Sequence, residues 1–115
     1  IFIHFCLTDI TIEKYFNKIK CCFAKNTDNT QTISSIKSIE KMILNKFKNI
    51  QNRTVSCRIQ EQLQNGFIKL YGDDSIKYGH QSKIQFLLKI SGIWASNQTN
   101  DFGLTFRFFI FNNQF

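Results

Sequence analysis

The sequence predicts one small α+β domain in which a helical first half precedes a second half of β-strands. One change in the period of the apolar residues carries this prediction. Apolar residues recur at helical spacing between residues 10 and 50, and they alternate at strand spacing from residue 53 to residue 113. The chain has 115 residues, enough for a single hydrophobic core. An α+β arrangement and a small barrel both fit this order of elements.

Three stretches define the first half. Residues 1 to 7 are apolar and predict a core strand. Asp9 is the expected cap of a first helix, because apolar residues follow it at helical spacing. These residues are Ile12, Phe16, Ile19 and Phe23. The polar stretch Asn26 to Thr32 lacks periodicity and predicts a loop.

A second helix is expected after this loop, with Ser34 or Ser35 as its cap. Its apolar stripe contains Ile36, Ile39, Ile43, Phe47 and Ile50, and its opposite side carries Lys37, Lys41 and Lys48. The stripe can pair as a coiled coil or pack on a sheet, and its short length favours the sheet.

The second half predicts a meander of four strands. The first runs from Val55 to Gln60, and the second, Phe67 to Tyr71, follows a turn at Asn65-Gly66. A polar loop is expected from Asp73 to Gln81. The last two strands should pair antiparallel, with their turn between Trp94 and Phe102.

These last two strands alternate strictly. The apolar faces contain Ile84, Phe86, Leu88 and Ile90 in one strand and Leu104, Phe106, Phe108 and Ile110 in the other. Lys89 belongs to the opposite face of the first strand, and Arg107 lies between Phe109 and Thr105 on the opposite face of the second. A cation within an aromatic row is the combination that binds single-stranded nucleic acid.

The formal net charge of +7 favours polyanionic partners, although a basic face that only keeps the protein in solution is an equal alternative. The four cysteines, Cys6, Cys21, Cys22 and Cys57, show neither a zinc-site spacing nor a disulfide framework, so reduced intracellular thiols are expected. No apolar run reaches the roughly 18 residues of a membrane-spanning helix.

One motif resembles a known family. Ser91-Gly92-Ile93-Trp94, followed by Phe102-Gly103-Leu104-Thr105-Phe106-Arg107, is similar to the C-terminal signature of phage-type single-stranded DNA-binding proteins of nucleocytoplasmic large DNA viruses. That pattern has a small residue, Gly, an aliphatic residue and Trp, then a turn and Phe-Gly-aliphatic-Thr-Trp with a basic residue. Here Phe106 replaces the second Trp, and the loop from Ala95 to Asp101 is about two residues longer than in the family pattern.

The resemblance covers the chain from about Tyr15 to its end and implies a five-stranded OB-fold barrel, as one domain over residues 1–115. The domain is expected to be truncated at both ends, because the first residue is Ile1 and the only methionine is Met42. It implies sequence-nonspecific binding of single-stranded DNA in viral replication, recombination or repair, at an intracellular replication site in the host cytoplasm or nucleus. Replication proteins and a second copy of the chain are further expected partners. The alternative is an OB-like module whose phenylalanine-rich surface binds a protein.

The residues expected to bind nucleic acid are four cations and two aromatic residues: Arg58, Lys69, Lys89 and Arg107, with Tyr71 and Trp94. Each cation can instead be a solvated surface charge, and Trp94 can instead close the core. Neither a nucleophile elbow nor a phosphate-binding loop nor a histidine–carboxylate cluster is present in the sequence. The protein is therefore predicted not to be an enzyme and to need no cofactor or metal. Asp73-Asp74 is expected to shape a turn and His80 to lie in a loop.

Overall fold

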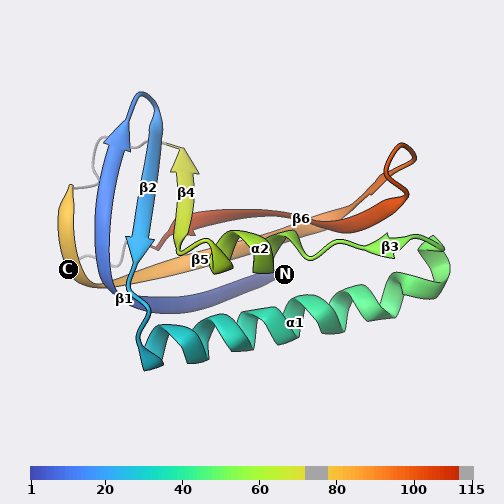
Figure 1. Ribbon diagram of the computed structural model, residues 1–115, viewed down its shortest axis with the longest axis horizontal. Helices are drawn as coiled ribbons and strands as arrows, with labels where there is room; N and C mark the ends of the chain where they lie inside the picture. The colour runs from blue at the N-terminus through green and yellow to red at the C-terminus, as the bar shows by residue number, and fades with distance from the viewer. Residues whose placement is uncertain (72–77, 112–115) are drawn as a thin grey trace.

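The computed structural model describes residues 1–71 and 78–111, without the side chains of Tyr15, Ile50, Gln51 and Tyr71. In chain order the elements are β1 (Phe2–Tyr15), β2 (Lys18–Phe23), α1 (Thr27–Gln51), β3 (Thr54–Val55), α2 (Arg58–Gln64), β4 (Phe67–Tyr71), β5 (Gly79–Ser96) and β6 (Asp101–Ile110). Figure 1 shows the long β5–β6 hairpin and, at a steep angle to it, the upright strands β2 and β4.

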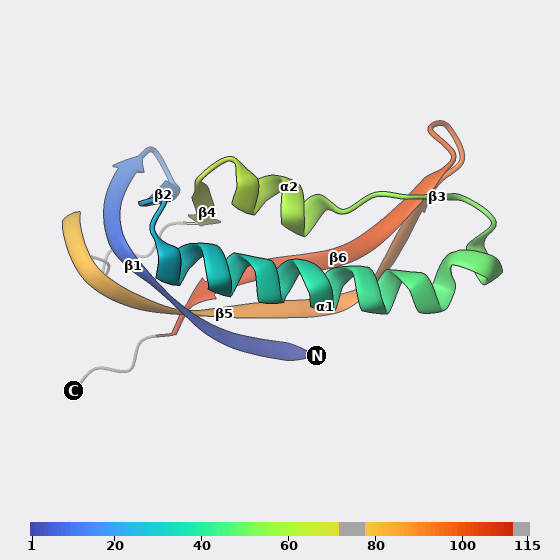
Figure 2. The same cartoon turned by 60° about the horizontal axis from the view of Figure 1, so that its bottom comes forward.

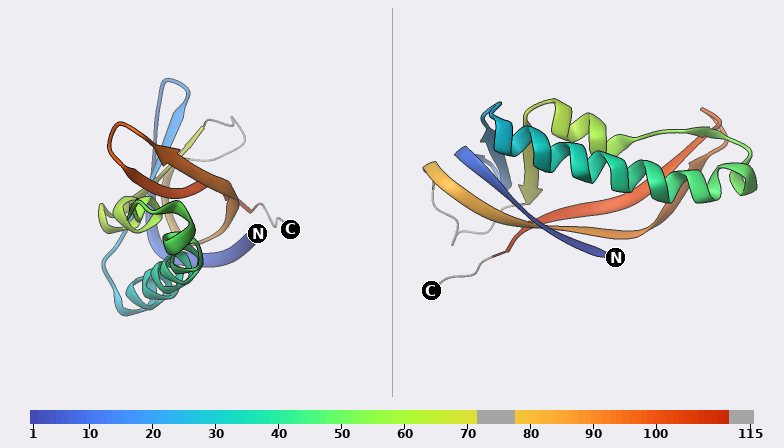
Figure 3. Two further views of the ribbon diagram at one scale, coloured as in Figure 1. Left: turned by 90° about the vertical axis from the view of Figure 1, so that its right-hand side faces the viewer. Right: turned by 90° about the horizontal axis from the view of Figure 1, so that it is seen from below.

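The strands form one mixed six-stranded sheet in the order β3-β6-β5-β1-β2-β4. Neighbouring strands are antiparallel except β3 and β6, which are parallel. Both helices lie on the same side of the curved sheet (Figures 2 and 3). The α+β, mostly β prediction is therefore confirmed. Among the described strands, β3 and β4 are edges, so this sheet is open and is not a closed barrel.

The core fills the space between the concave side of the sheet and the helices. Leu7, Phe86 and Leu88 come from the sheet, while Leu44 of α1 and Ile59 of α2 come from the helices, and all five are buried. The predicted alternation of the last two strands is confirmed, because its apolar faces point into this core. Their antiparallel pairing and the turn between Trp94 and Phe102 are also confirmed.

β1 bends sharply at Asp9, whose φ of 51° lies in the left-handed region. Before the bend, Phe5 and Leu7 point into the core, whereas after it Ile10 and Ile12 do so. The alternation of the strand therefore shifts by one residue, although its pairing with β5 keeps one register throughout. After the bend, β1 keeps its pairing with β5 as far as Ile12, and it also pairs with β2 from Ile10 to Tyr15.

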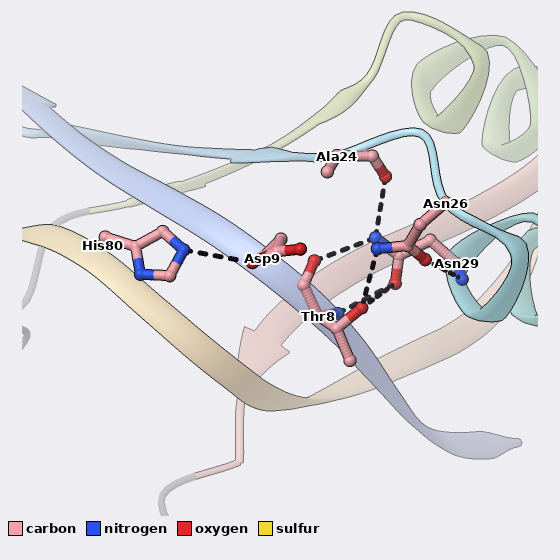
Figure 4. A network of polar contacts seen from close by, with 6 residues as sticks. All are labelled: Thr8, Asp9, Ala24, Asn26, Asn29 and His80. Atoms are coloured by element: carbon pink, nitrogen blue, oxygen red, sulfur yellow. Dashed lines mark hydrogen bonds and ion pairs between the residues drawn. The ribbon is translucent and has the colours of Figure 1, made fainter.

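The buried side chain of Asn29 in α1 holds the bend (Figure 4). Its Oδ1 accepts from the backbone N–H of Thr8 at 2.8 Å, and its Nδ2 donates to the carbonyls of Thr8 at 2.9 Å and Ala24 at 2.8 Å. Asn26, the N-cap of α1, accepts from the N–H of Asn29 and donates to the Thr8 hydroxyl. One amide thus joins β1, the end of β2 and the start of α1.

The predicted helical segment of residues 10–50 is wrong in its first part, because residues 10–23 belong to the β1–β2 hairpin. These residues fit both periods. Ile12, Phe16 and Ile19 have helical spacing, but the buried residues alternate as in strands, and Phe16 is a turn residue that is 96% exposed. The core strand expected within residues 1 to 7 is confirmed as the start of β1.

The predicted loop from Asn26 to Thr32 is also wrong, because α1 begins at Thr27. Ser34 and Ser35 lie inside the helix and are not its cap; the Ser35 hydroxyl donates to the carbonyl of Gln31 one turn earlier. The expected packing of this helix on the sheet is confirmed by its contacts with β1 and β6.

The expected strand from Val55 to Gln60, and with it the β-meander of residues 53–113, is only partly present. β3 contains two residues, and Arg58 begins α2. Ile59 and Leu63, four positions apart, are the buried residues of this helix, so the helical period decides the local structure. The turn at Asn65-Gly66 is confirmed, with Gly66 at φ 87°, but it joins a helix to a strand.

The loop expected from Asp73 to Gln81 falls largely on residues 72–77, outside the described residues, as does the Asp73-Asp74 turn. His80, predicted to be a loop residue, belongs to β5, and its Nε2 lies 3.2 Å from the exposed carboxylate of Asp9. The prediction is wrong because β5 extends back far enough to pair with the second part of β1.

Replacing Asn29 by Ala should strongly destabilise the fold, because the variant leaves the N–H of Thr8 and two carbonyls without their partner. Each buried polar group left without a hydrogen bond costs about 1 to 3 kcal/mol. We expect a loss of at least about 3 kcal/mol in urea unfolding, against less than about 0.5 kcal/mol for Asn45→Ala at an exposed position of α1. Equal losses in the two variants would contradict this role.

Candidate nucleic-acid interface

The side of the sheet opposite the helices carries cations and aromatic rings on β1, β5 and β6. Register places the side chains in rows across the three strands. Lys89 pairs with Phe2 on one side and with Arg107 on the other. In the next row Leu87 pairs with His4 and Phe109. We call the set Phe2, His4, Lys89, Arg107, Phe109 and Phe111 the outer patch.

The aromatic rings of the outer patch are accessible. Phe2 is 60% exposed, and Phe109 and Phe111 are each 39% exposed. The ring of His4 meets that of Phe111 edge to face, with centroids 5.0 Å apart. Exposed rings of this kind can stack on bases, which present a π-face whatever the sequence.

Lys89 and Arg107 are exposed and directly opposite each other on neighbouring strands. Like charges at such positions repel each other and destabilise a sheet. A phosphate oxygen placed between two such cations can accept hydrogen bonds from both side chains. The pair is therefore suited to an anion that lies along the outer face.

The six residues predicted from the sequence do not form one cluster. Lys89 and Arg107 lie together as expected. Lys69 is exposed on β4, on the far part of the sheet, and the side chain of Tyr71 lies outside the described residues. Arg58 was expected on a strand but is the first residue of α2.

The sequence prediction missed Phe2 and His4 as members of this surface. Alternation within residues 1 to 7 could have placed both on a non-core face, since Phe5 and Leu7 point into the core. It could not have shown that β1 pairs with β5, which lies about eighty residues away in the chain.

The environment of Trp94 lies between the two that the sequence left open, an exposed base-stacking surface and the buried core. It is half-buried, and the guanidinium of Arg58 lies 4.0 Å from the centroid of its ring. Its cross-strand partner is Gly103, where a Cβ atom would come within 2.8 Å of the ring and 2.6 Å of the Ser56 carbonyl. The glycine thus permits close packing of the tryptophan and of the chain leaving β3.

Arg58 is positioned by the start of α2, which a carboxylate of α1 caps. The buried side chain of Glu40 accepts hydrogen bonds from the backbone N–H groups of Ile59 and Gln60, each at 2.9 Å. Cys57, the N-cap residue, makes no capping bond with its own side chain. Burial raises the pKa of Glu40, while the two N–H donors act against this shift.

Three of the four cysteine thiols have raised pKa values. Burial raises the pKa of the Cys21 thiol to about 12, and it also raises the pKa of Cys22 and Cys57, so these thiols are poor nucleophiles. Within residues 1–71 and 78–111, His, Cys, Asp and Glu form no group of three or more suited to a metal ion. No helix in the described part of the chain has the length and apolar character needed to cross a membrane.

Comparisons with protein-family models, with curated proteins and with solved structures found no match to this chain.

The raised pKa of Glu40 predicts a pH dependence of stability. The folded protein holds this proton more tightly than the unfolded chain, so the free energy of unfolding falls as pH rises from about 4.5 through the folded-state pKa. Glu40→Gln removes the ionisable group and keeps an acceptor for one N–H. Glu40→Ala removes the hydrogen bonds to both N–H groups, so its loss in free energy of unfolding should exceed that of Glu40→Gln by about 1 to 2 kcal/mol.

Urea unfolding of the wild type and of Glu40→Gln between pH 4 and 8 tests this expectation. A change of about 0.3 kcal/mol in the difference between their free energies of unfolding is the smallest that counts. The stability of the wild type relative to Glu40→Gln should decline with rising pH. A difference that grows with pH would show that the two hydrogen bonds to the carboxylate outweigh its burial.

The contact between Arg58 and Trp94 predicts energetic coupling. We expect the double-mutant cycle of Arg58→Ala and Trp94→Ala to give a coupling of about 0.5 to 1 kcal/mol in urea unfolding, as for a partly exposed cation–π pair. Arg58→Lys, which keeps the charge, should retain part of it. Strictly additive losses would show that the two side chains do not interact in solution.

Proposed function

We propose that this protein binds single-stranded DNA without sequence preference through the outer patch, and that it does so in viral DNA replication, recombination or repair at intracellular replication sites. The observation that carries the proposal is the cross-strand row of Phe2, Lys89 and Arg107, with Phe109 and Phe111 exposed beside it. The net charge of +7 supports a polyanionic ligand.

The chemistry follows from this arrangement. The two cations neutralise phosphates along the backbone, and the exposed rings stack on bases at about 1 to 3 kcal/mol per base. The side chains of the row offer donors and apolar faces but no fixed set of groups that distinguishes one base from another. Binding is therefore expected to depend on strand and salt, and only weakly on sequence.

The resemblance to viral single-stranded DNA-binding proteins, and the OB-like barrel that it implies, belong to the same proposal. Geometric support comes from the motif itself. Trp94 of its first part pairs directly with Gly103 of its second part, and the intervening residues 97–100 form the hairpin turn. The two halves of the motif thus form one structural unit, and Arg107 at its end pairs with Lys89.

The exposed phenylalanines also favour a second function, in which the outer patch binds a protein. Phe2, Phe109 and Phe111 lie on the same side of the sheet, and clustered exposed apolar surface commonly marks a protein interface. Salt separates the two functions. Counterion release makes DNA binding weaken steeply as salt rises, whereas an apolar interface depends on salt only slightly.

The test is a fluorescence anisotropy titration with a mixed-sequence single strand of about 16 nucleotides, the upper site size of one OB fold. Lys89→Ala combined with Arg107→Ala should weaken binding about a hundredfold, since each of the two charge-assisted hydrogen bonds contributes about 1.5 kcal/mol. The slope of log affinity against log salt should become shallower by about 1.4, at roughly 0.7 per phosphate.

A matched control removes two exposed lysines of α1 by Lys41→Ala and Lys46→Ala, which gives the same net charge. This control should keep nearly the wild-type affinity and salt slope. If both double variants bind alike, general charge and not the outer patch attracts the strand. If the wild type itself shows no salt-dependent binding, the protein-binding alternative is favoured.

A further inference from the structure

A second cluster of cations lies on the outer side of β2 and β4. Lys20 of β2 and Lys69 of β4 are cross-strand partners, so their side chains leave the same side of the sheet. Their core-facing neighbours, such as Cys21 and Ile68, are buried and point the other way. Lys18, two positions before Lys20, is exposed on the same side.

Both ammonium groups of this pair lie against one aromatic ring. The Nζ atom of Lys20 is 4.3 Å from the ring centroid of Phe67, and that of Lys69 is 5.5 Å from it. The shared ring attracts each cation and so holds two like charges near each other. Glu13 of β1, the other cross-strand partner of Lys20, supplies one negative charge beside three lysines.

This cluster has the same arrangement of residues as the outer patch. In each case two cations are directly opposite on neighbouring strands, and a phenylalanine lies beside them: Phe2 for Lys89 and Arg107, and Phe67 for Lys20 and Lys69. The bend at Asp9 separates the two pairs, because one lies on the part of the sheet before it and the other on the part after it.

We propose that Lys20, Lys69 and Phe67 form a second contact for the same single strand, so that the strand runs along the convex side of the sheet from β6 to β4. This inference rests on the proposed function. The excess of positive charge fits a phosphate backbone, and the continuity of the outer side through β1 offers a path between the pairs. Two linked contacts bind more tightly than either alone once the strand spans both.

The experiment compares single strands of about 4 and about 16 nucleotides, the two ends of the usual range of site sizes. The short strand occupies one cluster, and the long strand reaches both. Lys20→Ala combined with Lys69→Ala should weaken binding of the long strand about tenfold and make its salt slope shallower by about 1.4. Binding of the short strand, which can still use Lys89 and Arg107, should change by no more than about twofold.

Lys41→Ala with Lys46→Ala on α1 is again the control of equal charge. The inference is overturned if Lys20→Ala with Lys69→Ala binds the long strand as this control does, while the proposed function then still stands on the effect of Lys89 and Arg107. Equal weakening of the short and long strands would also overturn it, because the second cluster would then be the primary site. Absence of wild-type binding to either strand would reject both proposals together.

Discussion

The bend of β1 at Asp9 is the constraint on which the remaining structure depends. It needs a left-handed residue in the middle of a strand, and the hydrogen bonds of the buried Asn29 to Thr8 and Ala24 stabilise it. Because the two parts of β1 run in different directions, β2 and β4 lie at an angle to the β5–β6 hairpin. Together with α1 and α2 they enclose the core. Buried amides that satisfy several backbone groups are costly to replace, which gives the bend its rigidity.

The same bend explains how charge is distributed over the molecule. On the concave side the helices cover apolar residues, whereas Lys20, Lys69, Lys89 and Arg107 are directed to the convex side. There two pairs of like charge are directly opposite on neighbouring strands, Lys89 with Arg107 and Lys20 with Lys69, and Glu13 is the other cross-strand partner of Lys20. Opposite charges directly across a strand pair stabilise a sheet more than like charges do. The repulsion is understandable if the surface is adapted to a polyanion, which is the central claim of the proposed function.

Local signals were sufficient to predict the β5–β6 hairpin and the pairing of Lys89 with Arg107. The β5–β6 hairpin follows from strict alternation and a short polar turn, and its register brings Lys89 to Arg107 without help from other elements. Residues 10–23 fit two periods equally, and the strand conformation depends on pairing of β1 with β5 and of β2 with β4, which no local pattern encodes. Arg58 was misplaced for a similar reason, since Val55, Cys57 and Ile59 alternate while Ile59 and Leu63 pack as helix neighbours against α1. Phe2 and His4 were missed because only the β1–β5 register brings them beside Lys89.

NMR chemical-shift mapping with a single-stranded oligonucleotide tests the central claim most directly, because it reports position and affinity in one titration. The account predicts that the largest backbone shifts fall on the outer-patch strands, around Phe2, Lys89 and Arg107, with smaller shifts around Lys20 and Lys69. The exposed side of α1, including Lys41 and Lys46, should remain unchanged. Shifts concentrated on α1, or an absence of shifts on the convex side of the sheet, would contradict it.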